Sequence, residues 1–149
     1  MYKLPRLIDT NAKSIILRDK EKLVVVSRCL ETENPRVIEE FRSNDYVVLT
    51  ACPEEEHVNM LGFKLAGILA RCKFKEVAVL TVDGSMHCTQ LHWMLEEVFK
   101  ITKPEATRKH FVEYKGNVVE IPLNIVKKSR FLSKLRGVQG LNSVDQNKA

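Results

Sequence analysis

Three of the four cysteines stand just after short apolar runs of the chain. Cys29 follows Ser27 and Arg28, Cys52 follows Thr50 and Ala51, and Cys88 ends the segment 83–88, which reads Asp-Gly-Ser-Met-His-Cys. Thiolates bind soft metals, act as nucleophiles and exchange disulfides. None of the cysteines belongs to a Cys-x-x-Cys pair, so the usual signature of a zinc ribbon or a dithiol redox motif is absent.

Histidines add imidazole groups to the same segments. His87 adjoins Cys88, and His92 follows four residues later, which places it one helical turn away on the same flank. Thiolate together with imidazole suits zinc, or an iron–sulfur cluster with one non-cysteine ligand. The sequence therefore predicts a metal or cluster site, or a thiol redox site, whose candidate ligands are Cys29, Cys52, Cys88, His92, His87 and His57. Cysteines packed as small buried hydrophobes are the alternative.

A second interpretation makes Cys88 a nucleophile in a hydrolase or transferase. We expect Cys88 in the first turn of a helix, where free backbone amides favour the thiolate. His87 or His92 could serve as its base, and Asp83 could orient an imidazole. The amides of Gly84 and Ser85 could stabilise an oxyanion or bind a phosphate. The simpler alternative is an ordinary turn between a strand and a helix.

Standard nucleotide-binding motifs are absent from the chain. It contains no G-x-G-x-x-G, no G-x-x-x-x-G-K-[ST] and no G-x-S-x-G. The sequence therefore gives no support for a dinucleotide or ATP site of a standard kind.

The basic residues are concentrated near the C-terminus. Residues 1–100 hold 14 basic and 15 acidic side chains, whereas residues 101–149 hold 10 and 4. A third interpretation is a non-catalytic adaptor that binds nucleic-acid phosphates or an acidic protein partner. The side chains that would do so are Lys127, Lys128, Arg130, Lys134 and Arg136. A solvated helix face explains the same residues without a partner.

Composition sets the class of protein. The chain has 149 residues, of which 44% are hydrophobic and 29% charged, as in an ordinary globular domain. No apolar run approaches the roughly 20 residues that cross a bilayer, and the first residues lack the apolar core of a secretory signal. We expect a cytoplasmic protein with reduced cysteines. We also expect one α/β domain over residues 1–137 and a flexible tail over 138–149.

Alternating elements must position the candidate residues. Buried strands are predicted at 23–27, 46–50 and 77–82. The first helix is predicted to begin at Asn34-Pro35 and the second at Pro53. A third helix, with Ser85 as its N-cap, is predicted to run to Lys100. Residues 14–17 are predicted to form a further strand that pairs with 23–27. Glu54, Glu55 and Glu56 are expected in the first turn of the second helix.

The last third of the chain has a different pattern. Residues 110–114 and 118–121 predict a β-hairpin, and residues 123–136 a basic amphipathic helix. The resulting fold class is a three-layer α/β/α domain, Rossmann-like or flavodoxin-like, with a mainly parallel sheet. In such sheets ligands bind at the carboxyl ends of the strands. Cys29, Cys52 and Cys88 should meet there, while Cys72, near the far end of its helix, is expected to be structural.

Overall fold

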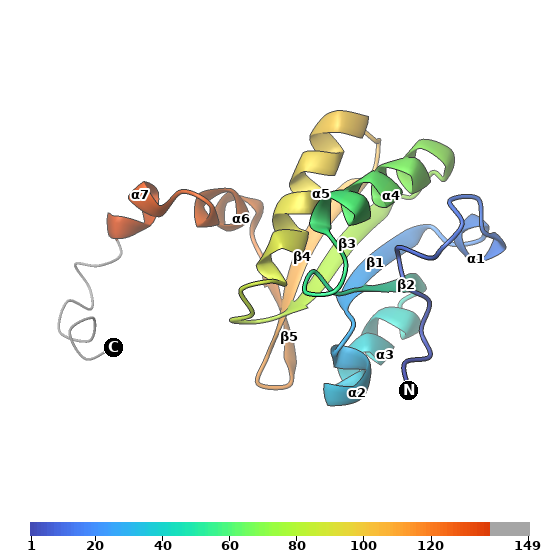
Figure 1. The fold of residues 1–149 in the computed structure, drawn as a ribbon, viewed down its shortest axis with the longest axis horizontal. Helices are drawn as coiled ribbons and strands as arrows, with labels where there is room; N and C mark the ends of the chain where they lie inside the picture. The colour runs from blue at the N-terminus through green and yellow to red at the C-terminus, as the bar shows by residue number, and fades with distance from the viewer. Residues whose placement is uncertain (138–149) are drawn as a thin grey trace.

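The computed structural model describes residues 1–137, and its centre is a five-stranded sheet in the order β2-β1-β3-β4-β5 (Figure 1). The first four strands run parallel, and β5 is antiparallel to β4. The strands are β1 (Lys22–Ser27), β2 (Tyr46–Ala51), β3 (Glu76–Val82), β4 (Thr107–Tyr114) and β5 (Asn117–Ile121). The three central strand predictions and the hairpin are confirmed.

Residue type explains why β1, β2 and β3 form the middle of the sheet. Each is a run of β-branched and aliphatic residues that is buried almost throughout, as expected for a strand covered on both faces. The edge hairpin is less buried and turns at Lys115 and Gly116, both with positive φ. Two successive residues of that kind are what a tight two-residue hairpin requires.

Helices cover both faces of the sheet. The short α2 (Leu30–Glu33) and α3 (Pro35–Ser43) pack on one face, and α4 (Val58–Arg71) and α5 (Thr89–Thr102) pack on the other (Figure 1). Each face has its own apolar cluster, one around Val37, Ile38 and Phe41 and the other around Leu61, Leu65 and Leu95. The predicted three-layer α/β architecture is therefore confirmed.

The crossover connections that follow β1 and β3 lead in opposite directions along the sheet. The crossover from β1 leads through α3 to β2 on one side, and the crossover from β3 leads through α5 to β4 on the other. Adjacent parallel strands whose crossovers leave on opposite faces leave a crevice at their carboxyl ends. In this chain that position is at the carboxyl ends of β1 and β3, after Ser27 and Val82.

The N-terminal part of the chain corrects one prediction. Residues 14–17 do not form a strand, because Ile15–Arg18 is the one-turn helix α1, which Ser14 caps by accepting a hydrogen bond from the Ile16 amide. Its aliphatic residues predicted a strand, but only Leu17 is buried, in the apolar cluster under α4 and α5.

The second long helix begins later than its sequence predicts. Pro53 does not start it; α4 begins at Val58 with His57 as N-cap, so the three glutamates at 54–56 lie in the preceding loop. Glu56 is held in that loop because its Oε1 accepts the Cys52 amide at 2.8 Å. In the next helix, α5 has Cys88 as N-cap in place of the expected Ser85 and ends at Thr102.

The predicted basic helix over 123–136 is two shorter helices. α6 (Leu123–Ser129) has Arg130 as its C-cap. α7 (Leu132–Leu135) follows after Phe131, whose backbone is extended. Only Val126 of the two helices is buried, so little packing holds a continuous helix together. The two helices extend beyond β4 and β5 at one side of the domain (Figure 1). The predicted tail over 138–149 lies outside the described residues.

No helix within residues 1–137 is both long enough and apolar enough to span a bilayer.

Candidate thiol site at the carboxyl edge of the sheet

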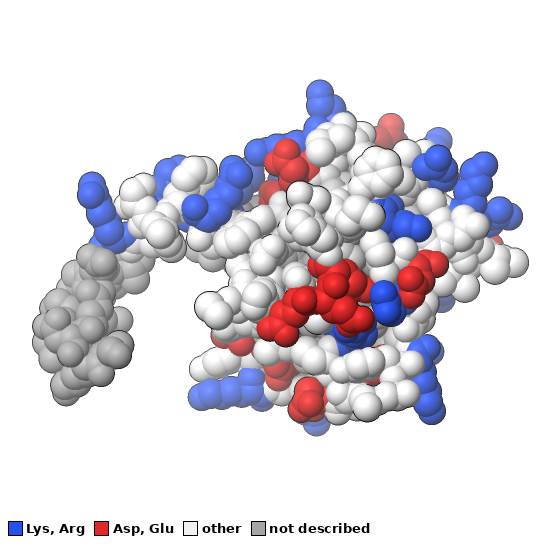
Figure 2. All heavy atoms as spheres, in the orientation of Figure 1, with Lys and Arg blue, Asp and Glu red and all other residues white. Residues whose placement is uncertain are grey.

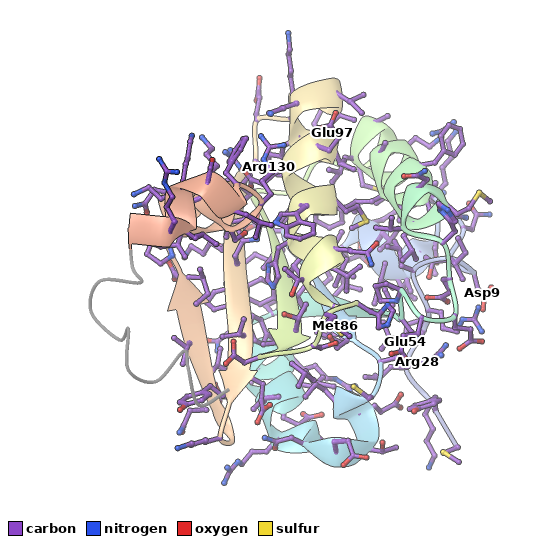
Figure 3. The ribbon with its side chains drawn as sticks, turned by 60° about the vertical axis from the view of Figure 1, so that its left-hand side comes forward. Asp9, Arg28, Glu54, Met86, Glu97 and Arg130 are labelled. Carbon is purple, nitrogen blue, oxygen red and sulfur yellow. The ribbon has the colours of Figure 1, made fainter. Side chains whose placement is uncertain are left out.

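The fold delivers three cysteines to one edge of the sheet, each from a different loop. Cys29 is the N-cap of α2 after β1, Cys52 follows β2, and Cys88 is the N-cap of α5 after β3. Cys29 is exposed, whereas Cys52 and Cys88 are half-buried. Arg28, Glu54 and Met86, each within two residues of one of these cysteines in the sequence, lie at that same end of the sheet (Figure 3).

Cys29 lies close enough to Cys52 and Cys88 for their charges to affect its pKa. The pKa of Cys29 is raised above its usual value, first by burial and then by the negative charge that Cys88 and Cys52 would carry. Within residues 1–137 the four free cysteines form no disulfide. In that part of the chain, no group of three or more Cys, His, Asp or Glu side chains is arranged to hold a metal ion.

A hydrogen bond joins two of the three loops. The Ser27 hydroxyl at the end of β1 donates to the Cys88 sulfur, with 3.1 Å between oxygen and sulfur. Ser27 is fully buried, and the Ser85 hydroxyl accepts the Cys88 amide at 3.2 Å. Cys88 is thus held by hydrogen bonds at both its sulfur and its backbone amide, at the carboxyl ends of β1 and β3.

Cys72 lies away from this group. It is the C-cap of α4, which runs back from the carboxyl edge, and its sulfur donates to the Ala12 carbonyl at 3.4 Å. Burial raises the pKa of its thiol. This placement agrees with a structural role and makes Cys72 a natural control for the other three.

The histidines named by the sequence are not arranged around the thiols. His57 caps α4, and its Nδ1 accepts the Asn59 amide at 3.1 Å. The His87 ring faces Glu54, with 3.4 Å between Nε2 and Oε1. No hydrogen bond between Cys88 and a histidine occurs within the described part of the chain, so the base required by the nucleophile hypothesis is not in contact with the sulfur.

His92 instead belongs to a buried polar chain that crosses from β3 through α5 to β4. Its Nε2 lies 2.7 Å from the Thr81 hydroxyl, and its Nδ1 lies 2.9 Å from Nδ1 of His110. The other ring nitrogen of His110 lies 2.8 Å from Glu96, which also accepts from Arg108 at 2.6 Å. Both nitrogens of His92 are therefore engaged, and neither is free for a metal.

Burial sets the protonation of this chain. It lowers the pKa of His92 to about 3, with a further contribution from His110, and it lowers the pKa of His110 as well. Burial alone would raise the pKa of Glu96, but hydrogen bonds from Arg108 and His110 outweigh it and lower that pKa. The two rings are therefore neutral at neutral pH, and Glu96 is ionised.

Charged side chains surround the thiols on the outside. Buried Glu56 faces Arg6 at 3.0 Å and Arg28 at 4.0 Å, and Arg28 also pairs with Glu55. Acidic side chains gather near the middle of this face with basic ones beside them, close to the loop between β2 and α4 (Figure 2). Glu55 and Glu56 are therefore each paired with an arginine.

The residues after β3 form a tight turn. Gly84 has a φ of 85°, and its missing side chain avoids the strain that such a backbone imposes on other residues. The Ser85 amide donates to the Val82 carbonyl at 3.4 Å, so this amide is not free for an anion in the way the sequence suggested. Asp83 is exposed and lines a cavity next to the turn.

Comparison with known proteins places this architecture in a family. The family model of the Rossmann-like domain matches residues 15–147. The chain belongs to this family. No curated protein and no solved structure matches the chain. Within this Rossmann-like domain, the crevice between β1 and β3 is the place where the fold itself favours a ligand.

The turn after β1 lacks the glycines of the standard dinucleotide-binding turn. A glycine-rich turn there lets a pyrophosphate approach the backbone and the next helix. Here the turn consists of Arg28 and Cys29, without glycine, and α2 has only four residues. Cys29 and Cys88 are the N-caps of the helices that follow β1 and β3.

Sequence reasoning missed the most buried part of this region. Glu96 follows His92 at helical spacing, and that pair could have been recognised on one flank of α5. His110 gave no such signal, because only the pairing of β3 with β4, which sets Val79 beside His110, brings it under the helix.

Proposed function

We propose that Cys29, Cys52 and Cys88 form one thiolate centre that binds a soft metal ion, either zinc or the iron of an iron–sulfur cluster. The observation that carries the proposal is that three loops, each after a different parallel strand, bring one cysteine each to the same carboxyl edge of the sheet. A dithiol redox site needs two sulfurs, whereas three thiolates are a ligand set for zinc or for a cluster with one further ligand.

The raised pKa of Cys29 supports this chemistry. Burial, and after it the charges of Cys88 and Cys52, disfavour the Cys29 thiolate in the protein alone, and a bound cation would offset both effects. The side chains must turn toward a common centre to bind, because within residues 1–137 they are not already arranged as a ligand group. Exposed Cys29, on the single-turn helix α2, is the sulfur with most freedom to do so.

The fourth ligand of this centre is not His92. Its nitrogens are committed to Thr81 and His110, and withdrawing one would leave a buried polar group without its partner. Three protein ligands leave a position open for an external molecule, which is the arrangement of catalytic rather than structural metal sites.

Metal analysis of protein purified without oxygen or chelator tests the proposal. We expect one zinc ion per chain, or iron with acid-labile sulfide and a visible sulfur-to-iron absorption band. Protein that emerges without metal is titrated with zinc, and separately reconstituted with iron and sulfide. Each of Cys29→Ser, Cys52→Ser and Cys88→Ser should weaken binding at least about tenfold.

Cys72→Ser is the matched control and should bind as the unmodified chain does. The proposal is wrong if the reduced chain takes up neither metal under these conditions, or if Cys72→Ser loses metal as the other variants do. It is also wrong if the thiols bind no metal but form a disulfide between two of the three, which would assign the site to thiol exchange instead.

A further inference from the structure

A cavity of about 210 Å³ lies beside the thiol site, between the carboxyl ends of β3 and β4 and the helix α6. Aliphatic side chains from β4, β5 and α6 form its wall, among them Val112, Ile121 and Ile125. No cysteine lines it, so a ligand bound in it would not depend on the metal proposal. Its volume suits a ligand of only a few heavy atoms, below the usual size of drug-like sites.

The hydrogen bonds that link Thr81, His92, His110 and Glu96 under this cavity can donate in only one direction along the chain of side chains. Ionised Glu96 can only accept, so Nε2 of His110 donates to it, and Nδ1 of the neutral His110 ring must then accept. Nδ1 of His92 therefore carries the hydrogen between the two rings, which leaves Nε2 of His92 without one. The Thr81 hydroxyl must donate its hydrogen to that nitrogen.

The other hydroxyls that line the cavity also direct their hydrogens elsewhere. The Thr89 hydroxyl donates to the Ser85 carbonyl at 2.9 Å. The Ser129 hydroxyl donates to the Val126 carbonyl at 2.6 Å and accepts from the Trp93 indole at 3.0 Å. A ligand in the cavity therefore meets lone pairs on Thr81 and Thr89, and no hydroxyl hydrogen.

One acidic residue, Asp83, lines the same cavity. It is exposed, and within residues 1–137 its carboxylate takes part in no ion pair. The acceptor oxygens of Thr81, Thr89 and Asp83, together with aliphatic walls, match a molecule that has several donors, a positive charge and a short hydrocarbon chain.

We propose that this cavity is a binding site for a small alkylammonium ion, a protonated primary amine with a branched chain of a few carbons. The ammonium group donates to the hydroxyl oxygens of Thr81 and Thr89 and faces the carboxylate of Asp83. The hydrocarbon part lies against Val112, Ile121 and Ile125. None of these side chains belongs to the thiol centre.

Amide-resolved NMR titration of the full chain tests it, with isoamylamine as the probe at neutral pH. Isoamyl alcohol and isovaleric acid have nearly the same shape with a neutral and a negative head group. We expect saturable shifts at Thr81, Gly84, Thr89 and Val126, in the millimolar range that so small a ligand allows. The alcohol should bind at least about tenfold more weakly, and the acid should produce no saturable shift.

Two variants separate charge from shape. Asp83→Asn should reduce the affinity for the amine to that for the alcohol and leave the alcohol unchanged. Val112→Phe should abolish binding of both by filling the cavity. Asp19→Asn, an exposed aspartate elsewhere in the chain, should behave as the unmodified protein. Equal binding of amine and alcohol, or shifts that map away from the cavity, would overturn the proposal.

Discussion

The hydroxyl of Ser27 donates a hydrogen bond to the sulfur of Cys88 although 61 residues separate them in the chain. Ser27 is the last residue of β1 and Cys88 is the N-cap of α5, so this contact joins the carboxyl ends of β1 and β3, the two strands whose crossovers leave on opposite faces of the sheet. The fold therefore places a buried donor against a thiol at the position where Rossmann-like sheets take their ligands.

Ser27→Ala should slow the alkylation of Cys88. A hydroxyl that donates to sulfur favours the thiolate, which is the reactive form, over the thiol. We expect the rate of reaction with iodoacetamide at fixed pH to fall several-fold. Mass spectrometry that resolves each cysteine measures it, and Cys72 in the same sample is the control. An unchanged rate at Cys88 would show that the hydrogen bond does not tune the sulfur.

Removing its two neighbours should make Cys29 more reactive. Burial is the first cause of its raised pKa, and the charges of Cys88 and Cys52 are the next. The double variant Cys52→Ala with Cys88→Ala leaves the burial and removes both charges, so the pKa of Cys29 should move down toward its ordinary value. Alkylation rates measured as a function of pH give this pKa directly.

The matched control for that experiment is Cys72→Ala, which should leave the pKa of Cys29 unchanged. A pKa of Cys29 that stays the same in the double variant would mean that the three thiols do not sense one another. That result would also weaken the argument for a shared metal centre, without bearing on the amine cavity.

Acidification should destabilise the fold through His92 before it protonates most carboxylates. Its pKa is about 3 in the folded chain against 6.5 in the unfolded chain. Between these values the unfolded chain binds a proton that the folded chain does not, so the free energy of unfolding decreases as the pH falls. The slope for one such group is about 1.4 kcal/mol per pH unit. The lowered pKa of His110 adds in the same direction.

Urea unfolding measured at a series of pH values checks this prediction. Below the ordinary pKa of glutamate, 4.5, Glu96 also begins to contribute, because its folded-state pKa is lowered. The window from pH 6.5 to 4.5 therefore isolates the histidines. His92→Gln should flatten the slope there. NMR titration of the imidazoles reads the same pKa values in the unmodified chain, and an ordinary value for His92 would refute the prediction.

Glu56→Gln should destabilise the loop that carries Cys52. One oxygen of Glu56 accepts the Cys52 amide, and the other lies near Arg6 and Arg28 but outside hydrogen-bond geometry. Glutamine keeps the amide contact and removes the charge that balances the two arginines. We expect a loss of about 1–3 kcal/mol in the free energy of unfolding. Glu39→Gln, on the exposed face of α3, is the control and should change it little.

Local pattern was sufficient for the elements with strong periodicity. The apolar runs at 23–27, 46–50 and 77–82 became the central strands, and Lys115-Gly116 became the hairpin turn, because burial on both faces and positive φ leave few residue types to choose from. Local pattern failed where tertiary packing decides. Ile15 and Ile16 suggested a strand, but no neighbouring strand within residues 1–137 pairs with them. The acidic residues 54–56 were expected in a helix but lie in a loop, where Glu56 accepts the Cys52 amide.

The sequence by itself determined the kind of sheet, and with it the edge to which Cys29, Cys52 and Cys88 are delivered, because parallel strands all end on the same side. Only the tertiary structure decided which side chains meet there. His92 is spaced to join Cys88 along its helix, yet the register of β3 and β4 gives it Thr81 and His110 as partners instead. Spacing along one helix fixes a direction, whereas a hydrogen-bonded partner from another strand depends on how the strands align.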